Sequence, residues 1–279
     1  MIVGNDISEY QGQPDWPTLK NNANFVIIKA GEGATYIDKQ FGYNRQKARD
    51  VNIPRGYYHF ARPDTGNTPQ QEAQFFVNLI NGQPLQEGES LYLDYEVQYI
   101  GDNVGWVQAW LDFVYQKLGV KPFFYSYQSM LTSHDWLPIV NSGYPLWVAA
   151  PTGDPNNNIF KTGAWPKAAM QQWGNETVPG ITTGVVDADV FFGDTAKFLS
   201  YGYHSPIQPN PPSNGQPTPP QTPPAPPSTP STPPAVDYKQ IVDSIEVIIN
   251  DKSQIPWWDF ILHDKRIDEI QGLIDKSTA

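Results

Sequence analysis

Short, almost continuously apolar segments recur through the first two hundred residues and are separated by polar or turn-forming residues. Continuous apolar runs of this length are typical of strands in a sheet that is covered on both faces, whereas strict alternation marks a sheet with one wet face. The pattern predicts eight strands, at residues 3–7, 25–30, 55–61, 91–96, 122–127, 145–149, 168–173 and 184–190.

Segments with helical periodicity lie between the early strands, at residues 38–51, 68–80 and 104–118. The second of these begins with Thr68, Pro69 and Gln71, which fit an N-cap, a first helical position and a capping box. Strand–helix alternation over five units, followed by three strands with short connections, predicts an α/β fold. We expect a closed TIM-like (β/α)5(β)3 barrel with fewer than eight helices.

The composition changes sharply after residue 205, because the segment 206–234 contains 14 Pro in 29 residues and no charge. Such a segment cannot bury enough apolar surface to offset its ordering entropy, so we expect a disordered, extended linker. The predicted domains are therefore a barrel at 1–205, a Pro-rich linker at 206–235 and a small helical tail at 236–279.

The tail has isoleucines at helical spacing, interrupted by Pro256-Trp257-Trp258. A segment this short is close to the lower limit for independent folding. We hypothesise a cell-wall-targeting module or a self-association module, with targeting favoured. A helical hairpin with no role beyond packing is the alternative.

Composition and charge exclude several classes of protein. The chain has 18 Lys+Arg against 29 Asp+Glu, a net charge of −11, which argues against a nucleic-acid binder. No apolar run is long enough for a transmembrane helix, and no membrane partner is expected. The absence of Cys excludes disulfides and Cys ligands. The N-terminal segment has neither a basic region nor an apolar region of the kind found in signal peptides.

Carboxylates and aromatic rings follow the predicted strands, at the barrel edge where function is expected. The candidates are Asp6, Glu32, Asp94, Glu96, Asp187 and Asp189, together with Tyr58, His59, Tyr125, Trp147 and Gln172. Rings stack on sugars, while amides and carboxylates bind hydroxyl groups. This composition predicts a saccharide site.

The segment containing Asp94 and Glu96 is the sharpest local signal. Residues two apart on a strand point to the same side, so both carboxyls should face the mouth, with Tyr95 turned outward. Their repulsion should raise one pKa, which suits a general acid of glycoside hydrolysis. The alternative is a solvated strand end. Asp187 and Asp189 share one face, and we favour Asp187 as the one at the mouth.

Other uses of these residues stay open. A metal site is one, but no His-x-x-x-His or calcium-loop spacing accompanies the acids, so no metal or cofactor is expected. Asp6 could be a plain turn residue and His59 a packed histidine. Tyr58, Tyr125 and Trp147 could equally fill the barrel, because periodicity cannot decide.

At these residues the chain resembles the lysozymes of glycoside hydrolase family 25, the Chalaropsis-type muramidases. The resemblance covers about residues 1–200, and its motifs run in the family's order. They are Gly4–Gln11, Phe25–Glu32, Gly56–Ala61, Leu93–Glu96, Phe124–Ser126, Leu146–Ala149, Gln172–Trp173 and Val186–Phe191. Where the family often continues Trp-Val-Ala with Tyr or Trp, this chain has Ala150-Pro151, so a sugar contact there would be lost or moved.

The resemblance implies the (β/α)5(β)3 barrel and a role for each matching residue. Glu96 would be the general acid and Asp94 its assistant, with Asp6 and Asp187 completing the acidic cluster. Tyr58, Tyr125 and Trp147 would line the saccharide groove. His59, Gln172 and Asp189 are further candidates for contact with the saccharide, with Asp189 as the alternative to Asp187 at the site. The substrate would be peptidoglycan of a Gram-positive host, cut between N-acetylmuramic acid and N-acetylglucosamine.

The lack of an export signal would suit a phage or prophage endolysin. Such a protein is made in the host cytoplasm and reaches the wall through a holin. The rival functions are hydrolysis of chitin or another N-acetylated glycan, and a non-catalytic glycan-binding phage structural protein. The presence of both Asp94 and Glu96 favours an enzyme over the latter.

Overall fold

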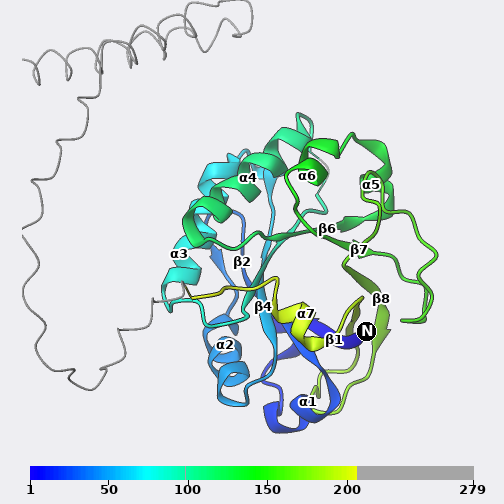
Figure 1. Ribbon diagram of the computed structural model, residues 1–279. Helices are drawn as coiled ribbons and strands as arrows, with labels where there is room; N and C mark the ends of the chain where they lie inside the picture. Colours follow the sequence, from blue (N-terminus) through cyan, green and yellow to red (C-terminus); the bar gives the residue numbers. More distant parts are fainter. Residues whose placement is uncertain (98, 206–279) are drawn as a thin grey trace, which may run out of the picture. The chain divides into compact units, whose positions relative to one another are not determined.

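The computed structural model describes residues 1–97 and 99–205, and Figure 1 shows their arrangement. The linker predicted at 206–235 and the helical tail predicted at 236–279 lie outside the described residues. Both stay predictions.

Eight strands form a closed barrel. They are β1 (Ile2–Ile7), β2 (Phe25–Glu32), β4 (Arg55–Phe60), β5 (Ser90–Asp94), β6 (Phe123–Tyr127), β7 (Leu146–Ala149), β8 (Met170–Glu176) and β9 (Val186–Phe191). The order is β1-β9-β8-β7-β6-β5-β4-β2, and pairing of β1 with β2 closes the ring. A short strand, β3 (Tyr36–Ile37), pairs with the end of β2 outside this ring. The eight strands predicted from the apolar runs are confirmed.

The last barrel strand runs against its neighbours. β9 is antiparallel to both β8 and β1, whereas the other pairs within the ring are parallel. The amino end of β9 therefore lies at the same edge as the carboxyl ends of the other strands. This reversal decides where Asp187 lies, because it is the second residue of β9.

Helices follow the first five barrel strands. They are α1 (Trp16–Asn22), α2 (Phe41–Asp50), α3 (Pro69–Asn81), α4 (Asn103–Leu118), α5 (Gln128–Ser133) and α6 (Leu137–Asn141), with α7 (Thr195–Leu199) after β9. The described residues contain no helix between β7 and β9, which confirms the predicted (β/α)5(β)3 plan. The capping box of α3 is present: the Thr68 hydroxyl accepts from Gln71 N at 3.2 Å, and Gln71 Oε1 accepts from Thr68 N at 2.9 Å.

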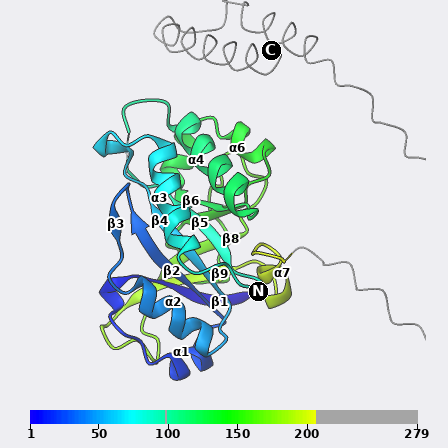
Figure 2. The ribbon, with the colours of Figure 1, turned by 90° about the vertical axis from the view of Figure 1, so that its left-hand side faces the viewer.

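Apolar side chains pack on both faces of the sheet, which explains why the strands read as continuous apolar runs. One layer lies between the strands and the helices, and a second fills the barrel. Phe198 of α7 belongs to the second layer and stacks on Phe25, with ring centroids 4.7 Å apart. In Figures 1 and 2, α7 lies beside the N-terminus, so this helix closes the amino end of the barrel.

A buried ion cluster ties the strands together at that amino end. Glu89, just before β5, accepts hydrogen bonds from Arg49 Nη2, Arg55 Nε and the Tyr57 hydroxyl, each at 2.7 Å. Burial acts to raise the pKa of Glu89, but the bonds from Arg49, Gln86 N, Tyr57 and Arg55 outweigh it and lower the pKa to about 2. A buried carboxylate with this many donors is stable as an anion, which makes the cluster a structural element.

Candidate active site

Four carboxyl groups meet at the opposite edge of the barrel. Asp6 lies near the end of β1, Asp94 is the last residue of β5, Glu96 follows two residues later, and Asp187 is the second residue of β9. Asp187 is the direct Cα partner of Asp6 across the β1–β9 pairing. Asp94 feels the charges of Glu96 and Asp6, while Asp6 feels those of Asp187 and Glu96. The structure thus brings together the four acids that the sequence predicted.

The Asp94–Glu96 pair has the predicted orientation, although β5 ends at Asp94 and not at Glu96. Tyr95, between them, is buried on the helix side, and its hydroxyl donates to Asn103 Oδ1 at 2.7 Å. The backbone is held to β6 by Tyr95 N donating to Tyr125 O at 3.0 Å. The alternation therefore continues past the strand end and directs both carboxyls to the mouth.

These acids resist ionisation. Burial, followed by repulsion from Glu96 and Asp6, holds the pKa of Asp94 well above its usual range. Burial also raises the pKa of Glu96, and the charge of Asp187 adds to this, while a hydrogen bond from Tyr125 acts in the opposite direction. Burial and Asp187 raise the pKa of Asp6 to about 7. A carboxyl that keeps its proton near neutral pH can act as a general acid.

A hydrogen-bond chain links the acids through neutral side chains. The Tyr125 hydroxyl lies 2.9 Å from Gln172 Oε1, and Gln172 Nε2 donates to Asp6 Oδ2 at 2.9 Å. The same hydroxyl is also within hydrogen-bonding reach of Glu96. Because a tyrosine hydroxyl has one proton, it can serve Gln172 or Glu96 at one time. Gln172 and Tyr125 thus connect the acid pair with Asp6.

The two aspartates of β9 have different positions. Asp187 is exposed at the mouth, as favoured, whereas Asp189 is 0% exposed one layer deeper in the barrel. Trp147 is 2% exposed, and its Nε1 donates to Asp189 Oδ1 at 3.0 Å. The prediction that Asp189 and Trp147 contact the saccharide is therefore wrong, because the two side chains are buried inside the barrel and hydrogen-bonded to each other. Trp147 fills the barrel, the alternative that periodicity had left open.

Tyr58 and Tyr125 are also largely buried, at 8% and 4% exposure. However, their phenol groups lie among the acids: Asp6 and Asp94 both contribute to raising the pKa of Tyr58, after burial. These two tyrosines therefore stay candidates for contact with a substrate at the mouth.

His59 lies away from the mouth, and its prediction as a saccharide ligand is wrong. The ring is 0% exposed between the sheet and the helices, stacked on Trp110 of α4 at 5.4 Å. Its Nε2 lies 3.0 Å from Glu72 Oε2 of α3. Burial lowers the pKa of His59. Because Tyr58 takes the barrel side of β4, the strand alternation sends His59 to the helix side.

Lys29 is a residue of the mouth that the sequence reasoning missed. Its Nζ lies 3.0 Å from Glu32 Oε2 and 5.0 Å from the centroid of the Phe60 ring. Lys29 is also a positive charge acting on Asp94. Glu32 is bound on its other oxygen by Arg62 Nη1 at 2.7 Å. Glu32 therefore serves as the counterion of Lys29 and Arg62. The sequence signal that could have indicated Lys29 is a single cation within an apolar strand.

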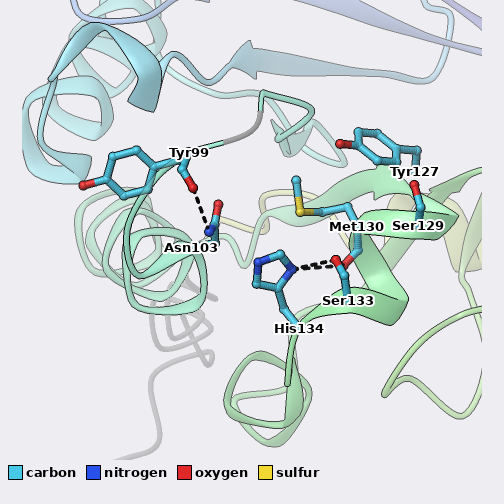
Figure 3. A pocket seen from close by; sticks show the side chains of 7 residues that line it. All are labelled: Tyr99, Asn103, Tyr127, Ser129, Met130, Ser133 and His134. Carbon is cyan, nitrogen blue, oxygen red and sulfur yellow. Dashed lines mark hydrogen bonds between the residues drawn. The ribbon is translucent and has the colours of Figure 1, made fainter.

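A hollow of about 360 Å³ lies beside the site, between the segment after β5 and helix α5. Figure 3 shows the side chains that line it: Tyr99, Asn103, Tyr127, Ser129, Met130, Ser133 and His134. Asn103 Nδ2 donates to Tyr99 O at 3.2 Å and fixes one wall. Among the described residues, the lining contains no Asp, Glu, Lys or Arg, so this hollow differs in chemistry from the acidic cluster.

Two further properties concern the described residues alone. Within residues 1–97 and 99–205, no three His, Cys, Asp or Glu side chains are grouped so that they could hold a metal ion. In the same residues, no helix has the length and apolar character needed to cross a bilayer.

A closed strand barrel with a cluster of high-pKa carboxyls at one mouth defines the protein as a barrel glycoside hydrolase. The sequence model of glycosyl hydrolases family 25 matches residues 5–181, and the chain belongs to that family.

Curated relatives include the N,O-diacetylmuramidase of Chalaropsis sp, 30% identical over 72% of this chain and 100% of that protein. Lysozyme M1 of Streptomyces globisporus is 38% identical over 28% of this chain, and this match spans only 26% of that protein.

Solved structures agree with the fold. The bacterial lysozyme of Streptomyces coelicolor superimposes with a TM-score of 0.59 at 25% identity, over 72% of this chain and 96% of that one. The CTP1L endolysin gives 0.58 at 29% identity, over 72% of this chain and 70% of that one.

Proposed function

We propose that this protein is an N-acetylmuramidase that hydrolyses the β-1,4 bond between N-acetylmuramic acid and N-acetylglucosamine in bacterial peptidoglycan. The observation that carries the proposal is the Asp94–Glu96 pair, two adjoining carboxyls with raised pKa values at the barrel mouth. Membership of family 25 and the similarity to curated muramidases support the choice of substrate.

In the proposed reaction, Glu96 donates its proton to the glycosidic oxygen as the bond to the anomeric carbon breaks. Water adds to that carbon: one of its protons stays in the new hydroxyl group, and the other returns to the Glu96 carboxylate, so the cycle closes. Asp94 orients the N-acetyl group or stabilises the positive charge that develops. Asp6 and Asp187 bind sugar hydroxyls and hold the local pKa values high. Tyr58 and Tyr125 line the sugar path.

Product analysis tests the proposal. Purified peptidoglycan and chitin oligomers are digested in parallel, and new reducing ends are identified. Muramic-acid reducing ends support the muramidase, whereas release only from chitin supports the hydrolase of another N-acetylated glycan. No release from either substrate, together with wall binding, supports a non-catalytic glycan-binding protein.

The variant Glu96→Gln serves as the internal control of that assay. Gln has the shape of Glu but no proton to transfer, so the rate should fall by about 100- to 10,000-fold. Because Glu96 is half-buried and outside the strands, folding should be intact by circular dichroism. Full activity of the variant would remove Glu96 as the acid.

For the biological setting we propose an endolysin that is made in the cytoplasm of its host and reaches the wall through a holin. Similarity to the CTP1L endolysin supports this role. Co-expression tests it: lysis should require both the intact enzyme and a holin. Lysis by the enzyme alone would contradict the proposed route.

For residues 236–279 we propose attachment to the wall of a Gram-positive host, with self-association as the competing role. The full chain and a chain ending at residue 235 are compared for binding to purified walls and for mass by light scattering. Loss of binding supports targeting, and a lower oligomer mass supports self-association. Unchanged binding and mass would contradict both.

A further inference from the structure

Two acidic side chains, Asp6 and Asp189, are packed against each other inside the barrel below the mouth. Asp189 lies on β9, next to β1 on one side and β8 on the other. Gln172 of β8 is the Cα partner of Asp189, and its Nε2 donates to Asp6 Oδ2 at 2.9 Å, so the carboxyl groups of Asp6 and Asp189 lie side by side and each acts on the pKa of the other. Two carboxylates have no donor between them, so a hydrogen bond between these groups requires that one of them is protonated.

The contacts of each carboxyl indicate which one holds the proton. Asp189 Oδ1 accepts from Trp147 Nε1 at 3.0 Å. Its second oxygen, Oδ2, is buried and receives no hydrogen bond from any group in residues 1–97 and 99–205. Asp6 Oδ2, in contrast, accepts from Gln172 Nε2 at 2.9 Å, which suits an ionised oxygen. Protonation is therefore most favourable at Asp189 Oδ2, because this oxygen is buried and accepts no hydrogen bond that a proton would disrupt.

The surroundings of Asp189 reinforce this assignment. The charged groups that face it are Asp6 of β1 and Asp187 of its own strand, and both are acidic. Its other neighbours are neutral: Trp147 of β7 donates to it, and Gln172 of β8 is its Cα partner. Burial, together with the charges of Asp6 and Asp187, holds the pKa of Asp189 well above its usual range. None of these neighbours is a cation that could compensate the charge of an ionised Asp189.

We propose that Asp189 is a positioning residue that keeps its proton at neutral pH and uses it to donate a hydrogen bond to Asp6, which holds the Asp6 carboxyl group in place facing the barrel mouth. The inference rests on the proposed muramidase function, in which Asp6 contacts the sugar. It gives Asp189 a role without substrate contact, which its complete burial requires. The hydrogen bond from Asp189 acts to lower the pKa of Asp6, against burial and repulsion.

Two substitutions separate a proton donor from a required negative charge. Asp189→Asn keeps the shape and an N–H donor but cannot ionise, whereas Asp189→Ala removes the donor. Loss of the contact that orients Asp6 should reduce the kcat of Asp189→Ala by about 100-fold. Asp189→Asn should recover at least about tenfold of this loss, since a donor is restored. Equal impairment of the two variants would overturn the proposal, because Asp189 would then act as an anion.

The pH profile gives a readout that a merely structural role would not move. Above the pH at which Asp189 loses its proton, two carboxylates face each other and Asp6 is displaced. Asp189→Asn has no proton to lose, so its activity should persist to higher pH than that of the wild type. Tyr92→Phe is the matched control, because Tyr92 is also buried in the barrel but does not donate to Asp6. Coincident alkaline limbs for the wild type and Asp189→Asn would overturn the proposal.

Infrared spectroscopy tests the proton without any enzyme assay. The difference spectrum of the full-length wild type minus Asp189→Asn at neutral pH should contain the C=O band of a protonated carboxylic acid. Only a carboxylate difference would overturn the proposal. If the wild type does not cleave peptidoglycan but the band is present, the muramidase assignment fails while the proton on Asp189 stands, so the two failures are distinguishable.

Discussion

The two ends of the barrel bury acidic side chains in opposite ways. At the amino end, Glu89 is surrounded by Arg49, Arg55 and Tyr57, and its pKa falls to about 2. At the mouth, burial and like charge raise the pKa of Asp6 to about 7 and hold that of Asp94 well above its usual range. One barrel thus contains a carboxylate with direct arginine partners and, at its other end, Asp6 and Asp94, whose raised pKa values show that burial and like charge outweigh the nearby positive charge.

The difference shows how charge compensation separates stability from reactivity. A buried carboxylate with enough donors is inert, and removing it leaves the arginines unpaired. Acids without such partners are destabilised as anions and hold protons that can be transferred. The direct arginine partners of Glu89, which Asp6 and Asp94 do not have within the described residues, therefore distinguish the two ends of this barrel.

The largest effect is expected from Asp94→Asn. The amide cannot take over the charge or the acid–base behaviour of the pair, so turbidity loss of cell-wall suspensions should slow by at least about 100-fold. Asp112→Asn on α4 removes the same charge far from the mouth and serves as the control; its hydroxyl partner there is Tyr144, at 2.6 Å. Wild-type rates for Asp94→Asn would reject the pair as the site.

At the other end, Glu89→Gln should reduce the free energy of unfolding by about 3–5 kcal/mol, because Arg49 and Arg55 lose their counterion. Urea denaturation measures this change. Activity per folded molecule should stay near that of the wild type. Glu87→Gln is the matched control: its partner is His204 at an exposed position, so the midpoint should not move. A large loss of activity without a loss of stability would contradict the structural role of Glu89.

His59→Ala should affect stability but not catalysis. Glu72 loses the ring nitrogen that contacts it at 3.0 Å, and a small cavity forms against Trp110, so about 1–3 kcal/mol of stability should be lost. Steady-state kinetics below the melting transition should give the wild-type KM. A raised KM at unchanged stability would return His59 to the sugar site.

The smallest effect concerns the pH dependence of stability at the mouth. The pKa of Asp6 rises from 3.8 to about 7 on folding, so the native state binds this proton more tightly. Its contribution to stability is present below pH 3.8 and is lost as the pH rises to about 7. Asp6→Asn removes this loss. Its melting temperature should exceed that of the wild type by at least about 2 °C at pH 8 and match it near pH 4. An equal gain at both pH values would contradict the assignment.

The strands could be predicted because burial on both faces leaves long apolar runs, as in Phe25–Glu32 of β2. The direction of β9 could not be predicted, since an apolar run reads the same in both directions. The same double burial caused the error at His59: all five residues of Arg55–His59 are buried, so polarity did not mark the inner face. Asp94 and Glu96 were predictable because Tyr95 separates two charges by one step of the strand alternation.

The segment after helix α7 is held at the amino end of the barrel by backbone hydrogen bonds. Tyr203 N donates to Glu89 O at 2.9 Å, and Gly88 N donates to Tyr203 O at 2.8 Å, so the residues just before 205 are fastened to the amino end. The last described residues and the four carboxyl groups therefore lie at opposite ends of the barrel strands.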